Sequence, residues 1–221
     1  IYLNDGDIAV HTPESVDLRT IENTPIERAV SSIDWNVDSA GKGKYAHFML
    51  KEIFEQPESL SNSIRGRLNH NLNSAVLSGL GLTPHELAKI SRIVIAACGT
   101  SLHAGMEGEY FFEDIAGIPA EVEQAAEFRY RNPIIDPDTL VLPISQSGET
   151  ADTLAAVREA MNKGAIVAAL CNVVGSTIAR EAGRGIYLHA GPEISVASTK
   201  AFTCQVTVLL MLALMLGRNR R

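Results

Sequence analysis

The chain has 221 residues, of which 46% are hydrophobic and 20% are charged, a composition typical of a globular protein rather than a disordered one. This length is enough for one domain with a full core, or for one domain plus an appendage. The formal net charge of −7 argues against nucleic acid as the main partner, because binding to a phosphate backbone requires a basic face.

The three cysteines, Cys98, Cys171 and Cys204, form no CxxC pair and lie in or beside apolar sequence. We therefore expect free, buried thiols in a reducing compartment. The chain begins at Ile1 in mid-pattern, without a basic and apolar leader. We expect a piece of a longer, cytoplasmic protein.

Residues 1–43 hold short extended runs, DIAVH and VDLRTI, separated by turn-forming sequence. This segment is too short for a core of its own, and we interpret it as the end of a neighbouring domain followed by the linker SAGKGK. Between Tyr45 and Leu68 apolar residues recur at helical spacing, and Pro57 is predicted to divide this stretch into two helices.

From Ser91 onward, apolar strand-like runs alternate with helical stretches: RIVIAA, TLVLPI, AIVAALC and GIYLHA are the strand candidates. This alternation predicts an α/β fold, a doubly wound parallel sheet flanked by helices in a three-layer, flavodoxin-like or Rossmann-like sandwich. The apolar run from Val206 to Leu216 has about half the ~20 residues that cross a bilayer, so we predict a buried core or interface helix and no membrane partner.

Four strand-to-helix loops, CGTS, SQSGET, NVVGST and SVASTK, are rich in serine and threonine. Ligands of open α/β sheets bind beyond the carboxyl ends of the strands, where these loops lie. One hydroxyl at each helix start can be a cap, and for NVVGST capping and ligand binding remain equally open. SQSGET has three hydroxyl residues, more than a cap requires.

Hydroxyls beside free helix N–H groups are typical of an anion site, and a phosphate group is the natural guest. No GxxxxGK[ST] run is present, so a phosphorylated metabolite fits better than a nucleotide. Glu149 would repel phosphate and is expected to point outward in the first helical turn, while Gly148 allows close approach of the backbone. We expect no metal and no cofactor.

Five segments in order, YAHFMLKEIFEQP, CGTSLHAG, AAEFRYR, SQSGETADT and EISVASTKAFTCQ, resemble the sugar isomerase (SIS) family. Within it, they are similar to the isomerase part of the glutamine–fructose-6-phosphate aminotransferases, or glucosamine-6-phosphate synthases. The resemblance implies that residues 44–221 form the first SIS subdomain. LNDGDIAVHT in turn resembles the tail of the family's glutaminase domain, so residues 1–43 would be that tail plus the linker.

The resemblance also implies site residues. Sugar phosphate would be bound by Ser145, Gln146, Ser147 and Thr150, joined by Thr100 and Ser101, with Val196 facing the sugar. Lys200 is expected to be structural, Cys98 is not expected to be a nucleophile, and Glu193 is expected to make a structural contact.

Fructose 6-phosphate or glucosamine 6-phosphate is the implied ligand, and the partners are the glutaminase domain, a second SIS subdomain and a second copy in a homodimer. The family's catalytic glutamate, histidine and lysine belong to the second subdomain, so this chain is expected to bind the sugar phosphate without turnover. Two alternatives stay open, a non-catalytic SIS sensor of sugar phosphates and a small stand-alone isomerase.

Overall fold

The computed structural model describes residues 1–30 and 41–220, in two compact units, Ile1–Ser39 and Ala40–Arg221. In the first unit, strands β1 (Asp7–His11) and β2 (Val16–Thr20) form an antiparallel hairpin, and the guanidinium of Arg28 donates two hydrogen bonds of 2.8 Å to the carboxylate of Asp7. The predicted linker, residues 39–44, lies partly outside the described residues.

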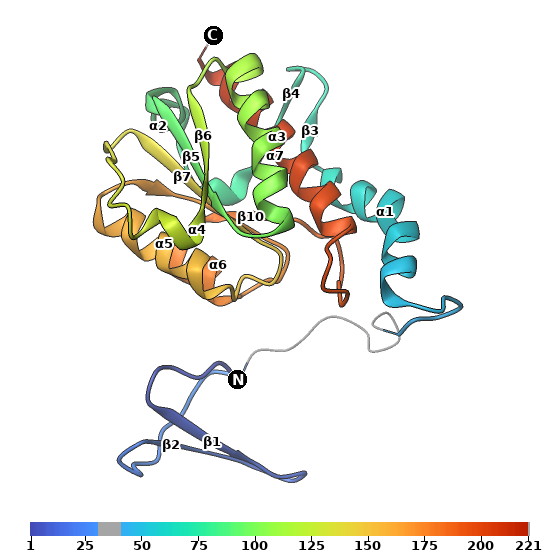
Figure 1. The fold of residues 1–221 in the computed structure, drawn as a ribbon, viewed down its shortest axis with the longest axis vertical. Helices are drawn as coiled ribbons and strands as arrows, with labels where there is room; N and C mark the ends of the chain where they lie inside the picture. The colour runs from blue at the N-terminus through green and yellow to red at the C-terminus, as the bar shows by residue number, and fades with distance from the viewer. Residues whose placement is uncertain (31–40, 221) are drawn as a thin grey trace. The chain divides into compact units, whose positions relative to one another are not determined.

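The second unit is built on a parallel sheet (Figure 1). Its strands are β5 (Arg92–Ala97), β6 (Ala120–Gln124), β7 (Thr139–Ser145), β8 (Ile166–Val167), β9 (Ala169–Cys171) and β10 (Gly185–Tyr187). The order is β6-β5-β7-β9-β10, with β8 paired to β7, and every pairing is parallel. This is the flavodoxin-like order 2-1-3-4-5, in which the direction of winding reverses between β5 and β7. The predicted fold class is confirmed.

Helices cover both faces of the sheet (Figure 1). One face carries α1 (Phe48–Ile64), α2 (Pro84–Lys89), α3 (Thr100–Phe111), which continues as a π-helical turn (Phe112–Ala116), and α7 (Lys200–Asn219), with the short β3 (Leu68–Asn69), β4 (Ser74–Ala75) and 3-10 turn (Ser78–Leu80) nearby. The other face carries α4 (Ala125–Phe128), α5 (Ala151–Asn162) and α6 (Thr177–Ala182). Along β5, Ile93 and Ile95 pack into the first helical layer, and Val94 and Ala96 into the second. Two-sided burial explains why this strand is apolar throughout.

Helix α7 is the central helix of the first layer. It is long and apolar enough to cross a membrane, but 67% of its most apolar window is buried inside the domain. Val208, Leu209, Leu212 and Leu216 are all at most 1% exposed. The predicted core helix is confirmed, although Phe202, Val206, Leu210 and Leu214 remain only partly buried.

Helix α1 is continuous, so the predicted division at Pro57 is wrong. Proline removes one backbone donor and leaves the carbonyl four residues earlier without its usual partner. Here that carbonyl, on Ile53, accepts a hydrogen bond of 3.0 Å from Nε2 of Gln56. A neighbouring side chain thus replaces the lost backbone donor, and the helix continues past the proline.

Candidate functional site

A cavity of about 360 Å³ lies at the carboxyl ends of β5 and β7, where the winding of the sheet reverses. Open α/β sheets bind ligands at this point because the loops after the two strands diverge there. Three of the four hydroxyl-rich loops contribute to its wall: the residues are Cys98, Gly99, Thr100, Ser101, Ile144, Ser145, Gln146, Ser147, Thr150, Thr153, Glu193, Ser195, Val196 and Ser198.

All seven residues predicted for the site line this cavity. Chain segments almost 100 residues apart, from Thr100 to Val196, are therefore brought to one place by the parallel sheet. The fourth loop, NVVGST, does not belong to the described wall. Its Ser176 is fully buried and begins α6.

The SQSGET loop holds its hydroxyls in a short hydrogen-bonded chain. Oγ of Ser145 accepts from the backbone N–H of Gly148 at 3.0 Å and lies 3.0 Å from Oγ1 of Thr150. Oγ of Ser147 accepts from the N–H of Glu149 at 3.2 Å. Because a hydroxyl both donates and accepts, Ser147 keeps its hydrogen for a ligand, and so does Thr150 when Ser145 donates to it.

Glu149 is exposed and does not line the cavity, but it precedes α5 instead of lying in the first helical turn as expected. Its Oε1 accepts a hydrogen bond of 2.8 Å from the backbone N–H of Thr177, in the first turn of α6. The NVVGST segment therefore supports the SQSGET loop from behind. This contact holds the Glu149 carboxylate, which would repel an anion, away from the anion-binding side of the loop.

Neither helix that begins at the cavity is capped by a side chain. Gly99 precedes α3 and Thr150 precedes α5, and neither provides a side-chain cap, Gly99 because it has no side chain. The first N–H groups of an α-helix have no partner within the helix, so they remain available to a ligand. Capping alone does not explain the hydroxyls of SQSGET.

Ser101 is held by α7. Its Oγ accepts a hydrogen bond of 2.9 Å from Nε2 of Gln205, a side chain with no solvent exposure. The hydroxyl of Ser101 is therefore also left with a free hydrogen to donate. Gln205 has no obvious signal in the sequence, because it lies in an otherwise apolar helix.

The positive charge at the cavity comes from the backbone. Its described lining contains no lysine, arginine or histidine, and Glu193 is the only carboxylate in it. The positive ends of two helices of 12 residues each, α3 and α5, converge there instead. Helix N-termini with hydroxyl donors suit a phosphate group or another oxyanion.

The SVASTK loop supplies residues that the sequence did not single out. Ser195 and Ser198 line the cavity beside Val196, whose side chain is fully exposed. Thr153, in the first turn of α5, also lines it, and its buried Oγ1 has no hydrogen-bond partner among the described residues. A hydroxyl residue in the first turn of the helix that follows SQSGET was a usable signal for Thr153.

Lys200 and Glu193 make the structural contacts expected of them. Nζ of Lys200, a residue 3% exposed, lies 2.7 Å from Oε2 of Glu55 on α1. The carboxylate of Glu193 accepts hydrogen bonds from the backbone N–H groups of Thr199 and Ala201, at 2.8 and 3.2 Å. It caps the start of α7.

All three cysteines are free, as predicted, and two of them are buried. Burial raises the pKa of the Cys171 thiol and that of the Cys204 thiol to about 11, which leaves both protonated at neutral pH. Cys98 is half-buried at the edge of the cavity, so the expectation of burial is wrong for it. It follows β5 directly, where the strand ends in the open loop.

A larger cavity, about 530 Å³, lies beside the edge strand β10 and is lined in part by Arg65, Arg67 and Arg184. None of the seven predicted residues lines it. It also lies away from the reversal point between β5 and β7. We therefore take the smaller cavity as the candidate site.

The family model of the SIS domain matches residues 86–215, which include both hydroxyl-rich loops of the reversal point. The chain belongs to the SIS domain family. The expected family resemblance is confirmed.

Two curated relatives share one name. A glutamine–fructose-6-phosphate aminotransferase (isomerizing) of Chlorobaculum tepidum is 54% identical over 220 residues, and that of Symbiobacterium thermophilum is 50% identical over 219 residues. Each alignment covers 99–100% of this chain but 36% of the relative. This SIS chain thus spans about a third of the length of these relatives.

A solved structure agrees with them. The C-terminal domain of glucosamine-fructose-6-phosphate aminotransferase from Francisella tularensis is 40% identical, with a TM-score of 0.74. The match covers 81% of this SIS chain and 50% of that chain. The fold and the family are therefore supported both by sequence and by structure.

Proposed function

We propose that this chain is the first SIS subdomain of a glutamine–fructose-6-phosphate aminotransferase and that it binds fructose 6-phosphate or glucosamine 6-phosphate. The observation that carries the proposal is the meeting of two helix N-termini without side-chain caps, those of α3 and α5, at one hydroxyl-lined cavity. The names of the relatives suggest the ligand, and the cavity provides the hydrogen-bond donors that would bind its phosphate.

In this proposal the phosphate oxygens accept hydrogen bonds from two loops. The residues of this phosphate cradle are Thr100, Ser101, Ser145, Gln146, Ser147 and Thr150. Val196 lies against the sugar, on the part of the wall that comes from the SVASTK loop. Hydrogen bonds to a dianion are stronger than neutral ones, so a cradle without cations can still bind.

The same proposal assigns residues 1–43 to the tail of a glutaminase domain plus linker, and residues 44–221 to the SIS subdomain. The partners are then the rest of the glutaminase domain and a second SIS subdomain, in a cytoplasmic protein. Proton transfer between sugar carbons needs a general base within hydrogen-bond reach. Glu193, the only carboxylate in the described wall, is already occupied at the start of α7.

Titration calorimetry of the 221-residue chain tests this proposal. We expect fructose 6-phosphate to bind, fructose without phosphate not to bind, and no glucosamine 6-phosphate to form when ammonia is supplied. The phosphate cradle explains the first two results, and the lack of a free general base in the described wall explains the third. Equal affinity for fructose and its phosphate would contradict the cradle, and turnover would contradict the role given to Glu193.

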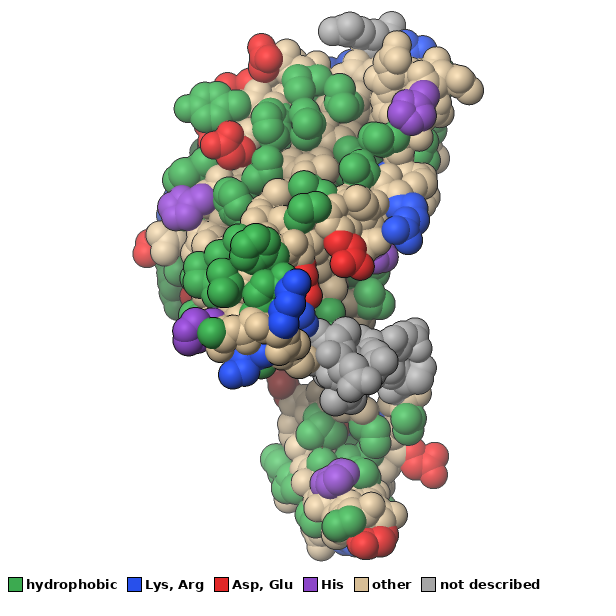
Figure 2. Space-filling model, turned by 90° about the vertical axis from the view of Figure 1, so that its right-hand side faces the viewer, with side chains coloured by type: hydrophobic (Ala, Val, Ile, Leu, Met, Phe, Trp, Pro, Cys, Tyr) green, Lys and Arg blue, Asp and Glu red, His purple; other side chains and the backbone are tan. Residues whose placement is uncertain are grey.

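We further propose that two copies of the chain associate through α1. The apolar side chains of this helix face outward: Met49, Leu50, Ile53 and Phe54 are 39–63% exposed. Figure 2, which faces the side of the domain where α1 lies, shows hydrophobic side chains gathered over this surface. Exposed apolar patches of this kind typically mark an interface. The apolar helix α7, for which the sequence left a core and an interface role open, is mostly buried.

Sedimentation equilibrium tests this association. We expect a dimer, and Phe54→Ser should weaken it by roughly tenfold, because buried aromatic side chains dominate interface energy. Ile134→Ser is the matched control, since Ile134 is 80% exposed and lies outside α1. A monomer at high concentration, or an equal effect of the two substitutions, would contradict the proposal.

A further inference from the structure

Helix α1 packs against the domain through its polar side. Its fully buried residues are Glu52, Ser59 and Ser63, while Met49, Leu50, Ile53 and Phe54 are exposed and Ile64, at its end, packs partly buried against the core. The residues that contact the domain, Glu52, Glu55, Gln56 and Ser59, are spaced i, i+3, i+4 and i+7 and so share one face of the helix. Along Glu52–Ser59 specific hydrogen bonds, rather than hydrophobic burial, hold the helix to the domain.

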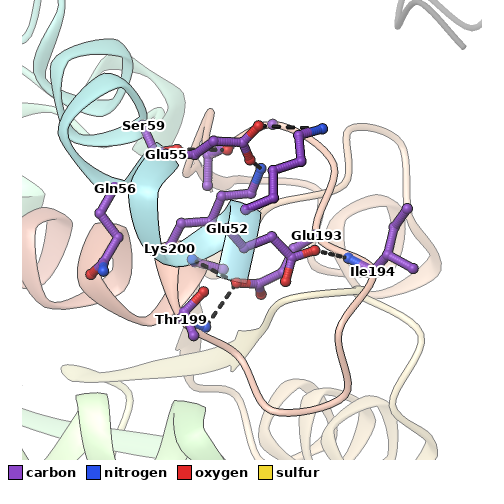
Figure 3. Close-up of polar contacts among 12 residues, drawn as sticks. Glu52, Glu55, Gln56, Ser59, Glu193, Ile194, Thr199 and Lys200 are labelled. Carbon is purple, nitrogen blue, oxygen red and sulfur yellow. Dashed lines mark hydrogen bonds and ion pairs between the residues drawn. The ribbon is translucent and has the colours of Figure 1, made fainter. Parts of the chain in front are cut away.

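These bonds go to the 191–199 loop and its two flanks. Oγ of Ser59 donates to the carbonyl of Ala190 at 3.0 Å, before the loop. Oε1 of Gln56 accepts from Oγ1 of Thr203 at 2.5 Å, after it. Lys200 and Glu55 form the ion pair described above (Figure 3). Helix α1 therefore holds the chain on both sides of the loop.

Glu52 holds the middle of the loop (Figure 3). Glu52 is only 2% exposed. Its Oε1 accepts hydrogen bonds from the backbone N–H groups of Ile194 and Ser195, at 2.6 and 3.2 Å. Its Oε2 accepts from the hydroxyl of Ser195. A buried carboxylate is costly unless its oxygens are well satisfied, so this geometry fixes the loop in one conformation.

The loop held in this way is part of the candidate site. Ser195, Val196 and Ser198 line the cavity, and together with Glu193 they are the part of its wall that comes from the 191–199 loop. Glu52 itself is not part of the described wall. It contacts the neighbour of Val196 and can influence a ligand only through that loop.

We propose that Glu52 is a positioning residue for the sugar-binding wall of the cavity. The proposal rests on the proposed function and assigns separate roles to the loops that line the cavity. The CGTS and SQSGET loops bind the phosphate, whereas α1, through Glu52, sets the position of the loop that contacts the sugar. Loss of the Glu52 contact should therefore impair recognition of the sugar and spare recognition of phosphate.

The variant Glu52→Gln tests this. It keeps the shape of the side chain but replaces one acceptor oxygen by an amide donor, which cannot accept from the loop. We expect amide hydrogen exchange at Ile194 and Ser195 to become about tenfold faster. Affinity for fructose 6-phosphate should fall by about tenfold, or about 1.4 kcal/mol, while affinity for inorganic phosphate should change by less than about twofold.

Glu58→Gln is the matched control, because Glu58 lies on the same helix, is exposed and loses the same charge. Ser195→Ala provides a second variant that removes one donor to Glu52 without changing a buried charge, and a smaller change in the same direction is expected. The proposal is refuted if Glu52→Gln matches Glu58→Gln in loop exchange and in fructose 6-phosphate affinity, or if phosphate affinity falls equally. If the unsubstituted chain binds no sugar phosphate, the proposed function fails, and the exchange rates still decide whether Glu52 holds the loop.

Discussion

Replacement of Gly148 by alanine is expected to lower the free energy of unfolding by about 3 kcal/mol or more, and to abolish binding at the cavity. Gly148 has a φ of +67°, a conformation that costs other residues strain. A Cβ atom there would lie 2.0 Å from Oγ of Ser176 and 2.4 Å from its Cβ. The buried start of α6 cannot move aside, because Ile178 donates to the carbonyl of Gly148 at 2.9 Å.

Two further variants separate the clash from the backbone strain. Gly164 has a φ of +81° and open space around its Cα, so Gly164→Ala should cost only about 1 kcal/mol. Ser176→Gly removes both clashing atoms, and glycine is tolerated at the start of a helix. Chemical denaturation should show that Gly148→Ala combined with Ser176→Gly is at least about 1 kcal/mol more stable than additivity predicts. Additive losses would contradict steric exclusion at Gly148.

The role of Gly148 differs from that read in the sequence. The sequence suggested that the backbone of Gly148 approaches a ligand closely, and the adjacent Ser147 does line the cavity. The structure adds a second cause, the contact with Ser176 from the NVVGST segment. A contact between segments almost 30 residues apart depends on the register of β7 and β9, which no local pattern specifies.

The sheet could be predicted where strands are buried on both sides. RIVIAA and TLVLPI became β5 and β7 because a strand between two helical layers must be apolar throughout. Strand β6 was missed, since it lies at the edge of the sheet and alternates in the sequence AEVEQ. The run AIVAALC was expected as one strand and is divided into β8 and β9.

The position of α1 could not be predicted, because its pattern is reversed. Helical spacing of apolar residues normally indicates the buried face. Here Phe54 is 63% exposed and Glu52 is 2% exposed. A sequence shows which residues share a face of a helix, but not whether a polar face has hydrogen-bond partners waiting in the fold. The loop around Ile194 and Ser195 provides them, and it lies about 140 residues further along the chain.

Removal of single hydroxyls from the SQSGET loop is expected to weaken sugar-phosphate binding without unfolding the domain. Thr150→Ala and Ser147→Ala should each cost about 1–3 kcal/mol of binding free energy, the scale of one hydrogen bond to a charged group. Ser147 retains its hydrogen for the ligand, and Thr150 does so when Ser145 is the donor in the bond between them. The free energy of unfolding should fall by less than about 1 kcal/mol, because the Thr150 side chain caps no helix N–H.

Titration calorimetry with fructose 6-phosphate, beside chemical denaturation, measures the two effects separately. Thr150→Ser keeps the hydroxyl and should bind nearly as the unsubstituted chain does, which distinguishes the loss of a donor from the loss of a methyl group. Thr177→Ala is the matched control, since Thr177 belongs to NVVGST, the hydroxyl-rich loop that does not form part of the described wall. Its affinity should be unchanged. If Thr150→Ala and Ser147→Ala also leave the affinity unchanged, the phosphate is not bound by this loop, and the hydroxyls of SQSGET serve only its internal hydrogen bonds.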